Sequence, residues 1–316
     1  MTRTKLEEAL ETTFPGFDRV DVPDLKFSSG KVRDIFDVGE ELLIVTTDRI
    51  SAFDRILTTV PFKGDVLNGM SNYWFEKTAE IVPNHIRKRL TRRSVVVAKC
   101  EVIPIEVVIR GYLTGSAWRD YSDGRSVSGH ELPKGLRFNE RFEAPLFTPS
   151  TKAELGEHDE PISTEEILRR KLVDPDLWRQ IEETAFRLFE YGSERAADRG
   201  LILVDTKYEF GLLDGSLVLV DEIHTPDSSR YWYRDTYDEL FDTGAKQRKI
   251  DKEYLRQWLM DKGFMGHGEP PVIPDEIRVN VAERYIRSYE LITGDQFEGK
   301  ITTVEAEHNA ILSYLT

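Results

Sequence analysis

The stretch from residue 201 to 230 carries the side chains whose types and spacing are best suited to chemistry. It reads LILVDTKYEFG at 201–211 and, after a short turn, SLVLVDEIHTPDSSR at 216–230. In an extended segment side chains alternate between two faces, so Asp205, Lys207 and Glu209 point the same way. The pattern predicts a strand with a polar, functional face and an apolar face that packs on a core.

The turn of this hairpin decides where a second carboxylate lies. A two-residue loop at 214–215 pairs Glu209 with Val220 and sends Asp221 to the opposite face. A three-residue loop at 214–216 instead places Glu209 opposite Asp221, with Cβ atoms about 5 Å apart. Such carboxylates repel unless a cation lies between them, and Mg²⁺ prefers hard oxygen ligands together with substrate phosphates. We therefore predict the three-residue register and one Mg²⁺ bound by both acids; the alternative is a surface hairpin with solvated charges.

A second unusual run, VIPIEVVIRGYLTGS, occupies residues 102–116. On an extended strand Glu106 and Arg110 share a face, and the following Gly111 and Gly115 allow the backbone to turn closely past a ligand. The fork of an arginine beside Ser116 gives paired donors for a carboxylate or phosphate. The run predicts an anion site, whereas the alternative is a strand end with a surface arginine.

Two further polar segments are candidates for the same site. The run FTPSTKAELGEHDEPIS at 147–163 places Lys152 after consecutive hydroxyls and before several acids, with no packing rationale. The run SSGKVRDIFDVGEELLIVTTD resembles a strand, turn, strand lid that supplies Lys31 near phosphate. A solvated connection and an ordinary hairpin are the respective alternatives.

Composition limits the class of protein and its partners. The chain has 316 residues, with 43 Lys and Arg against 57 Asp and Glu, which gives a formal net charge of −14. An acidic surface repels nucleic acid and anionic lipid, so neither is an expected partner. Small anionic ligands remain compatible with local clusters of Lys and Arg.

Cysteine usage and hydropathy indicate the compartment. Cys100 is the single cysteine, so an intrachain disulfide and a cysteine-rich zinc site are both excluded. No stretch resembles a signal peptide or reaches the ~20 apolar residues of a membrane span. We expect a cytoplasmic protein without membrane association, and the sequence leaves monomer and homodimer open.

The order of elements predicts an α+β fold and not a doubly wound sheet. Strands dominate from about 26 to 110, interrupted by a helix at 71–82, and long functional loops are expected over 111–162. Ser163 with Glu166 forms a plausible capping box for the helices that follow. The predicted helices are 164–173, 176–198, 251–262, 275–293 and 303–314.

Two lobes are expected from this order. Residues 1–110 would form a β-rich N-terminal lobe with the lid hairpin. Residues 111–316 would form an α+β lobe with the metal-binding hairpin and the C-terminal helices. A cleft between a β-rich and a helical lobe is a common place for a nucleotide.

Together the motifs closely resemble the SAICAR synthetase (phosphoribosylaminoimidazole-succinocarboxamide synthase) family. VIPIEVVIRGYLTGS and LVDTKYEFG resemble its two signatures, and SGKVRD, DRISAFD, FTPSTKAELGEHD and DEIHTPDSSRYW also match, within about 28–260. The hairpin is also similar to the catalytic and metal-binding segments of protein kinases. It has an Asp-x-Lys pattern (Asp205, Lys207), then an acid (Glu209), then a second acid twelve residues later (Asp221). The kinase strings HRD and DFG are absent, so an ordinary protein kinase is disfavoured.

The resemblance implies a reaction and a kinase-like or ATP-grasp-like fold. The carboxylate of carboxyaminoimidazole ribonucleotide (CAIR) is activated by ATP, and the amine of L-aspartate attacks it to give an amide, ADP and phosphate. Catalysis then rests mainly on positioning and on neutralising phosphoryl charge. The alternatives are a small-molecule kinase of the inositol phosphate type and a catalytically inactive nucleotide-binding protein.

The resemblance also implies roles at the nucleotide end of the site. Glu209 and Asp221 would bind Mg²⁺, while Lys207 and Lys31 would contact the phosphates of ATP. Asp205 would orient the reacting groups, and with Lys207 it forms the predicted catalytic pair. The backbone that includes Lys99, Glu101 and Val102 would hold adenine as a hinge between lobes.

The remaining roles concern the other substrates. Arg110 and Ser116 would bind aspartate or the carboxylate of CAIR. Asp227 and Arg230 would bind the ribonucleotide, with Arg230 on its 5′-phosphate. Lys152 and Asp54 are further candidates near the same pocket.

Overall fold

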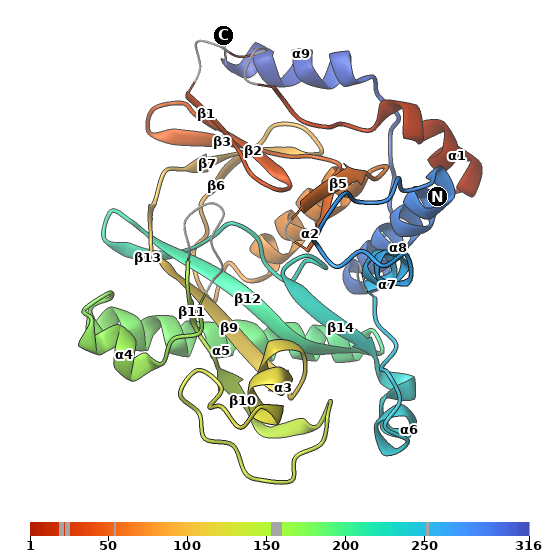
Figure 1. The fold of residues 1–316 in the computed structure, drawn as a ribbon. Coiled ribbons are helices and arrows are strands. Elements are labelled where there is room, and N and C mark those ends of the chain that lie inside the picture. The colour runs from red at the N-terminus through yellow and green to blue at the C-terminus, as the bar shows by residue number, and fades with distance from the viewer. Residues whose placement is uncertain (19–21, 23–25, 54, 153–159, 251–252, 316) are drawn as a thin grey trace. The chain divides into compact units, whose positions relative to one another are not determined.

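The protein divides into two compact units that do not follow the expected boundary at residue 110. The structure, a computed structural model, describes residues 1–316 except 19–21, 23–25, 54, 153–159, 251–252 and 316. Unit 1 comprises 1–73, 85–99 and 251–316, and unit 2 comprises 74–84 and 100–250. The strand that leads to Arg110 thus belongs to unit 2, and the C-terminal helices belong to unit 1, because tertiary contacts and not chain order define the units. Figure 1 labels the elements.

Unit 1 is built on an antiparallel five-stranded sheet. Its strands, in spatial order, are β1 (Lys26–Ser29), β2 (Arg33–Asp37), β3 (Glu41–Thr46), β7 (Ser94–Ala98) and β6 (Ile86–Arg89). A separate hairpin is formed by β4 (Arg49–Ala52) and β5 (Arg55–Thr59). Alternation of buried and less buried residues along β2 places Phe36 in a core that also holds Leu43 and Val96. The strand-rich character predicted for this region is confirmed.

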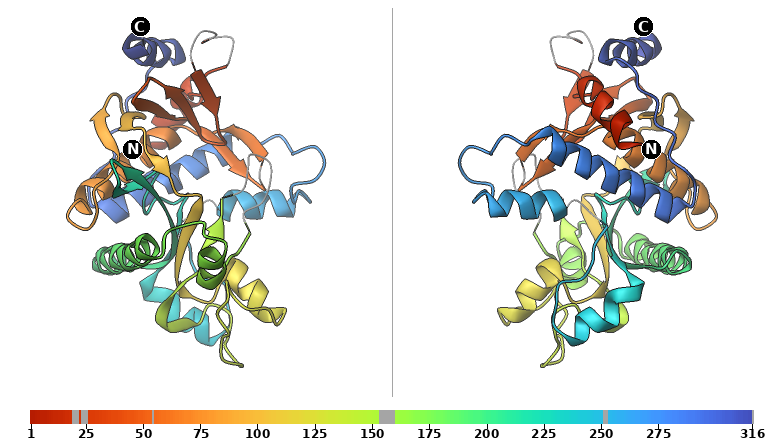
Figure 2. Two further views of the ribbon diagram at one scale, coloured as in Figure 1. Left: turned by 90° about the vertical axis from the view of Figure 1, so that its left-hand side faces the viewer. Right: turned by 90° about the vertical axis from the view of Figure 1, so that its right-hand side faces the viewer.

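The helices of unit 1 come from both ends of the chain. They are α1 (Arg3–Glu8), the 3₁₀ turn η1 (Ala9–Thr12), α2 (Lys63–Lys77), which continues into unit 2, α7 (Glu253–Asp261), α8 (Asp275–Thr293) and α9 (Val304–Leu315). Ile311 of the last helix belongs to the same buried core as Phe36 of the sheet. Figure 2 shows the ribbon of this helix beside the sheet of unit 1. The bounds of the predicted C-terminal helices match the structure within two residues. Helix α2, in contrast, starts eight residues before the predicted residue 71. The cause is that Asp65 and the apolar residues after it extend the buried helical pattern.

A cluster of buried charges lies inside unit 1. The guanidinium of Arg93 lies 2.9 Å from a carboxylate oxygen of Asp65, 3.2 Å from Asp48 and 3.6 Å from Glu307. Asp48 also accepts hydrogen bonds from the backbone amides of Phe14 (2.7 Å) and Gly64 (2.8 Å). Burial raises the pKa of Asp65 to about 6, because one arginine does not offset the desolvation of a carboxylate beside two other acids.

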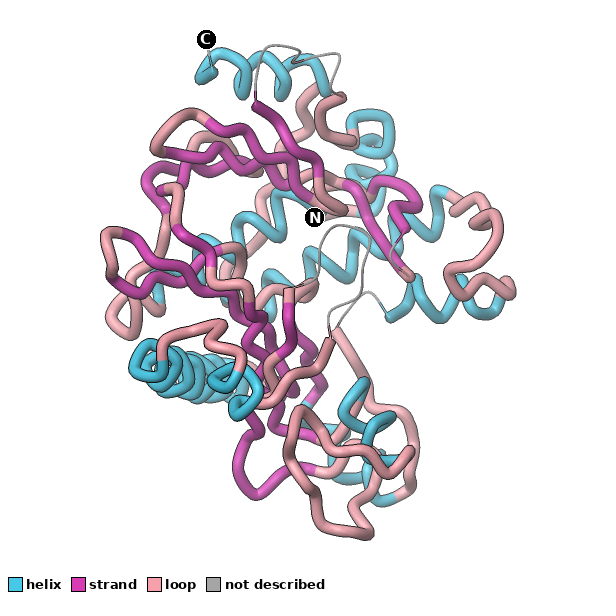
Figure 3. Tube along the Cα trace, turned by 60° about the vertical axis from the view of Figure 1, so that its left-hand side comes forward, coloured by secondary structure: helices cyan, strands magenta, loops and turns pink. Residues whose placement is uncertain are grey.

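Unit 2 is organised around one long strand, β12 (Leu201–Leu213). Its partners are antiparallel and lie along both edges. One edge of β12 pairs with β8 (Glu101–Val102) and β9 (Ile105–Tyr112). The other edge pairs with β13 (Ser216–Val220) and β14 (Ser229–Tyr233). Strand β9 also pairs with β10 (Arg141–Phe147) and β11 (Ser150–Thr151). Figure 3 shows these strands in magenta. A strand with neighbours on both edges fixes the position of every side chain that it carries.

One face of this sheet is covered by α5 (Pro175–Asp198). Asp174 caps the helix by accepting hydrogen bonds from the amides of Asp176 (2.9 Å) and Leu177 (3.3 Å), and Pro175 suits the first turn. The shorter α4 (Thr164–Arg169) begins at Ser163, whose hydroxyl accepts from the Glu166 amide at 3.2 Å, as the capping box predicts. The other helical elements of unit 2 are α3 (Gly115–Ser122), η3 (Arg234–Thr236) and α6 (Tyr237–Asp242).

The prediction of long loops over 111–162 was wrong in part. This region contains α3, β10 and β11. Leu113, Ala117 and Val127 form a small core there, and such tertiary burial gives order to a segment whose local periodicity is poor. The α+β class is confirmed, and each helix in the described residues is too short or too polar to cross a lipid bilayer.

Candidate active site

The polar face of β12 exists as predicted. Lys207 Nζ lies 2.7 Å from Glu209 Oε1, so both side chains are on one face. Thr206, Tyr208 and Phe210 on the other face have at most 1% of their surface exposed. Strict alternation along an extended chain therefore separates the polar groups from the packed core.

Arg110 is fixed by three side chains from different elements. It lies opposite Asp205 in the pairing of β9 with β12, and one nitrogen is 3.4 Å from Asp205 Oδ2. Its Nε donates to Thr148 Oγ1 (2.9 Å) and its remaining nitrogen to Ser116 Oγ (3.1 Å). Burial lowers the pKa of Arg110 and the carboxylate of Asp205 acts against this shift. A guanidinium held at all three nitrogens is preorganised to face an anion.

Arg230 approaches the same carboxylate from the opposite edge of β12. It pairs with Asp205 in the register with β14 and lies 3.0 Å from Oδ2. Gly115, at φ +62°, lies against this guanidinium, and a Cβ at residue 115 would come within 2.2 Å of an Arg230 nitrogen. Glycine is required there both by the left-handed backbone and by the space that Arg230 occupies.

A second group of charges lies further along the same face. Lys207 Nζ lies 2.7 Å from both Glu106 Oε1 and Glu209 Oε1, and Lys152 Nζ also contacts Glu209. Burial favours a lower pKa for Lys207, but the carboxylates of Glu209, Asp221 and Glu106 outweigh it and raise the pKa above its ordinary range. Lys207 is therefore protonated, and Glu209 is nearly buried between two ammonium groups.

The three-residue register predicted for the hairpin was wrong. Glu209 pairs with Val220, and the loop has two residues, Asp214 at φ +51° and Gly215 at φ +76°. Two successive left-handed residues form the tight turn whose twist matches that of the flanking strands, so the shorter loop wins. Asp221 follows the end of β13 at φ +65°, where strand alternation no longer applies. Its charge still acts on Lys207, so it belongs to the same electrostatic cluster.

The donor set bears on the predicted Mg²⁺. Among the described residues, no group of three or more His, Cys, Asp or Glu side chains has the arrangement of a metal cage. Glu209 and Asp221 supply carboxylate oxygens, the ligand type that Mg²⁺ prefers, but they are too few to hold the ion alone. The residues therefore fit a Mg²⁺ that is bound through one or two carboxylates and completed by substrate phosphates and water.

The loop between β13 and β14 is anchored to the site strand. The amide of Lys207 donates to the carbonyl of Ser228 at 3.0 Å. The Thr225 amide donates to Ser228 Oγ at 3.2 Å, and the amide of Asp227 donates to Thr225 Oγ1 at 3.3 Å. These bonds form a compact turn that places the half-buried Asp227 directly before β14 and Arg230.

A buried histidine supports this loop. His224 has no exposed surface, its Nε2 lies 2.6 Å from Tyr208 Oη, and its carbonyl accepts from Tyr231 Oη at 2.9 Å. Its ring packs on Gly192 of α5, where a Cβ would come within 2.3 Å of the ring. Burial lowers its pKa to about 3, so the ring is neutral and structural.

The predicted residues of unit 1 have defined local positions. Lys31 is exposed in the turn between β1 and β2. Arg49 holds this turn through the carbonyl of Gly30 (3.0 Å) and through Asp34 (2.7 Å). Lys99 forms a surface ion pair with Asp37 at 2.7 Å, and Asp54 lies outside the described residues.

The predicted hinge residues of unit 2 lie on β8. Glu101 pairs with Leu212 and Val102 with Gly211 on β12, and both Glu101 and Val102 are exposed. The backbone passes from unit 1 to unit 2 between Lys99 and Cys100. The adenine role of this segment remains a prediction.

Two residues of the site were not among the predicted ones. Glu106 bonds Lys207 and Thr148 bonds Arg110. The parity of Glu106 with Arg110 on one strand was a usable signal. For Thr148 the sequence offered no signal beyond the hydroxyl residues of the run at 147–163, because its contact with Arg110 depends on the pairing of distant strands.

Comparison with known proteins identifies the family. The SAICAR synthetase family model matches residues 26–270. A phosphoribosylaminoimidazole-succinocarboxamide synthase of Bacteroides thetaiotaomicron is 47% identical over 283 residues, covering 88% of this chain and 90% of that protein. The synthase of the same name from Legionella pneumophila is 47% identical over 288 residues, covering 87% and 90%.

Solved structures agree with the sequence matches. The SAICAR synthase from Saccharomyces cerevisiae, in complex with SAICAR, superposes with a TM-score of 0.78 at 36% identity and covers 87% of this chain and 97% of that one. A SAICAR synthetase in complex with ADP gives a TM-score of 0.67 at 25% identity, covering 87% and 100%. With a family model over most of its length and relatives of this similarity, the chain belongs to the SAICAR synthetase family.

Proposed function

We propose that this protein joins L-aspartate to CAIR with ATP, giving SAICAR, ADP and phosphate, the aspartate-ligating step of de novo purine biosynthesis. The observation that carries the proposal is the continuous polar face of β12, on which Asp205 lies between two arginines and Lys207 lies between two glutamates. One end of this face suits the anions of the ribonucleotide and aspartate, and the other suits triphosphate. Family membership supports this reaction.

The reaction needs two transfers that these residues can support by charge and position. First the γ-phosphoryl group leaves ADP and bonds to a carboxylate oxygen of CAIR. The amine nitrogen of aspartate then bonds to the carboxyl carbon of CAIR. The bond from this carbon to the phosphorylated oxygen breaks, so phosphate leaves with that oxygen, and the nitrogen gives up a proton. Both steps develop negative charge on phosphoryl oxygens, so preorganised cations are the main catalytic resource.

Lys207 is the proposed cation on the triphosphate. It is protonated and held at 2.7 Å by Glu106 and Glu209, so no reorganisation is needed when phosphate arrives. Glu209 and Asp221 are the proposed ligands of Mg²⁺, which when bound neutralises phosphate charge. Lys31 and the backbone at Lys99 to Val102 complete the proposed contacts with ATP.

Arg110, Ser116, Arg230 and Asp227 are the proposed contacts with the other substrates. Arg110 is nearly buried and its three nitrogens are bonded, whereas the Arg230 side chain is 35% exposed. Arg230 therefore suits the 5′-phosphate of the ribonucleotide, and Arg110 with Ser116 suits a carboxylate. Asp205 is proposed to orient both arginines and the reacting groups. Lys152 and Asp54 are the further candidate contacts with these substrates.

A kinase of the inositol phosphate type is not supported, since the family model and the relatives reported above are SAICAR synthetases. The deciding assay measures ADP release by the purified protein with ATP, Mg²⁺ and CAIR, with and without L-aspartate. We expect ADP release to depend on aspartate and to match SAICAR formed mole for mole. ADP release that is unchanged when aspartate is omitted would contradict the ligase.

We propose the cytoplasm as the compartment, where reducing conditions suit the lone Cys100.

A further inference from the structure

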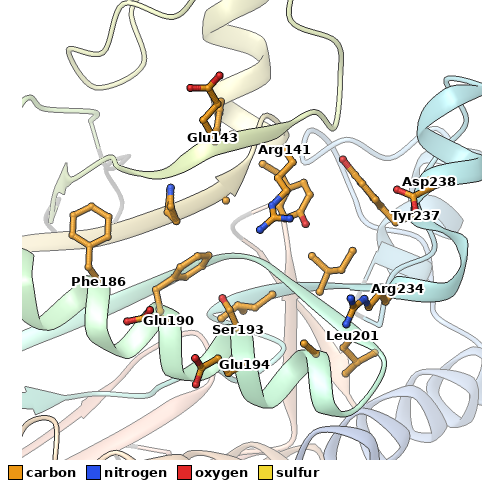
Figure 4. A pocket seen from close by; sticks show the side chains of 18 residues that line it. Arg141, Glu143, Phe186, Glu190, Ser193, Glu194, Leu201, Arg234, Tyr237 and Asp238 are labelled. Carbon is orange, nitrogen blue, oxygen red and sulfur yellow. The ribbon is translucent and has the colours of Figure 1, made fainter.

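A cavity lies within unit 2, on the side of the sheet that α5 covers. Its volume is about 790 Å³, and it lies between α5, the ends of β9, β10 and β12, and the segment after β14 (Figure 4). Gly111 leaves room for Phe189 of α5, whose ring would lie 3.3 Å from a Cβ at residue 111. This size is in the range of sites for small organic ligands.

The cavity lies on the opposite face of the sheet from the proposed active site. Tyr208 points towards α5, because its hydroxyl contacts His224 and that ring packs on Gly192 of α5. Lys207 and Glu209 have the opposite parity and face away from α5. A ligand in the cavity would therefore not meet the lysine and carboxylates of the active site.

Two arginines line the cavity without a carboxylate partner. Arg141 enters from β10 and Arg234 from the segment after β14, as Figure 4 shows. Neither forms an ion pair with any residue that the structure describes. Both act electrostatically on the nearly buried phenol of Tyr112, which also lines the cavity, and Asp238 acts on that phenol in the opposite sense. The two guanidinium charges therefore meet in one place, beside one carboxylate.

The same wall holds an unsatisfied hydroxyl. Ser193 Oγ of α5 is buried and has no hydrogen-bond partner among the described residues. Buried hydroxyls in native proteins are almost always bonded, so an orphan that lines a cavity indicates a missing partner. The partner can be an acceptor on a bound molecule.

Aromatic rings supply the rest of the lining that bears on the ligand. Phe186 and Tyr237 lie on different sides of the space in Figure 4, and Phe189 also lines it. Four acids, Glu143, Glu190, Glu194 and Asp238, also border it, and the Glu143 carboxylate points away from it in Figure 4. The aromatic walls favour a ring, while the unpaired guanidiniums favour an anionic group.

We propose that this cavity is a binding site for a small organic anion with an aromatic body, separate from the ligase site. The acidic group meets Arg141 and Arg234, and the ring lies against Phe186 and Phe189. Ser193 donates its hydroxyl hydrogen to an acceptor on the ligand. The proposal goes beyond the ligase function and does not rest on it.

The test uses the full chain and the fluorescent probe 1-anilinonaphthalene-8-sulfonate, an aromatic anion. We expect one saturable site, and binding at least ~10-fold weaker for the neutral analogue N-phenyl-1-naphthylamine, which corresponds to the loss of about 1.4 kcal/mol of charge interaction. Saturating ATP with Mg²⁺ should not displace the probe. Displacement by ATP, or equal affinity for the neutral analogue, would overturn the proposal.

Variants locate the site. The double variant Arg141→Gln with Arg234→Gln should bind the probe at least ~10-fold more weakly. Ala197→Phe, which fills the cavity, should weaken binding of the probe by the same factor. The matched control, Arg125→Gln with Arg179→Gln, removes two arginines of unit 2 that do not line the cavity. Unchanged binding in the first double variant, with its circular dichroism and Tm intact, would overturn the site. Aspartate-dependent ADP release in the same variants reports separately on the ligase.

Discussion

Arg110 and Arg230 share one oxygen atom, Asp205 Oδ2, at 3.4 and 3.0 Å. They reach it from strands on opposite edges of β12, each directly opposite Asp205 in the register. Two cations around one carboxylate leave an excess positive charge at the place where substrate anions are proposed to bind. The same carboxylate prevents the two guanidiniums from repelling each other when the site is empty.

Asp205→Asn should therefore disable the enzyme without abolishing its fold. The amide keeps the shape but removes the charge that orients both arginines, and a displacement of about 1 Å costs about 10²-fold in rate. We expect aspartate-dependent ADP release to fall by about this factor, with KM for CAIR raised. Circular dichroism establishes the fold of the variant, and a variant with wild-type kcat and KM would remove Asp205 from the machinery.

Asp221→Asn should keep the fold and lower turnover at least ~10²-fold, because charge stabilisation by a bound metal is worth several kcal/mol. Asparagine tolerates the left-handed backbone at this position, so strain does not confuse the result. Asp214→Asn is the matched control, since it lies on the same hairpin, also at positive φ, but in the exposed turn. Near-normal turnover of the Asp221 variant over a range of Mg²⁺ concentrations would exclude it as a ligand.

Gly115→Ala should raise KM for CAIR at least ~10-fold, since a displaced Arg230 loses a charge-assisted contact. The new Cβ would overlap an Arg230 nitrogen, which must move. Gly124→Ala is the control, because it has similar positive φ (+73°) with no atom within 4 Å of the added Cβ. Both substitutions bear a backbone cost of about 1 kcal/mol, so only the KM separates them. Equal KM values in the two variants would show that Arg230 does not bind CAIR.

Asp65 predicts a pH dependence of stability. Its pKa is about 6 in the folded protein against an ordinary 3.8, so between these values the folded state binds more protons than the unfolded state. Stability therefore falls as pH rises from about 4 to about 6, by on the order of 3 kcal/mol from this group. The free energy of unfolding in urea, compared between the wild type and Asp65→Asn from pH 4 to pH 7, isolates the effect. A difference that is constant with pH would contradict it.

Local patterns predicted much of the fold, and long-range pairing accounts for what they missed. The alternation along β12 and the cap at Ser163 depend on neighbouring residues, and the structure agrees with them. The hairpin register was missed because metal geometry was given more weight than the preference of Asp-Gly for a two-residue turn. The turn preference of Asp-Gly acts through the local backbone alone, whereas the metal argument depends on a bound ion.

The candidate site shows the same division. The residues on β9 and β12 could be chosen from parity, but the contact of Thr148 with Arg110 requires knowing that residues 38 apart meet. The α3 and β10 elements owe their order to a small core that only the folded chain assembles. The Arg93 cluster likewise joins Asp48 to Glu307, and no local pattern reports such a pairing.

The backbone at Asp221 restricts which acids can serve at that position. Left-handed φ is several-fold more accessible to Asp and Asn than to most other residues with a side chain. Glutamate offers the same functional group but is less suited to this conformation, and its longer side chain would shift the oxygens. We therefore expect Asp221→Glu, a change that keeps the charge, to lower turnover, because the backbone conformation limits this position as well as the charge.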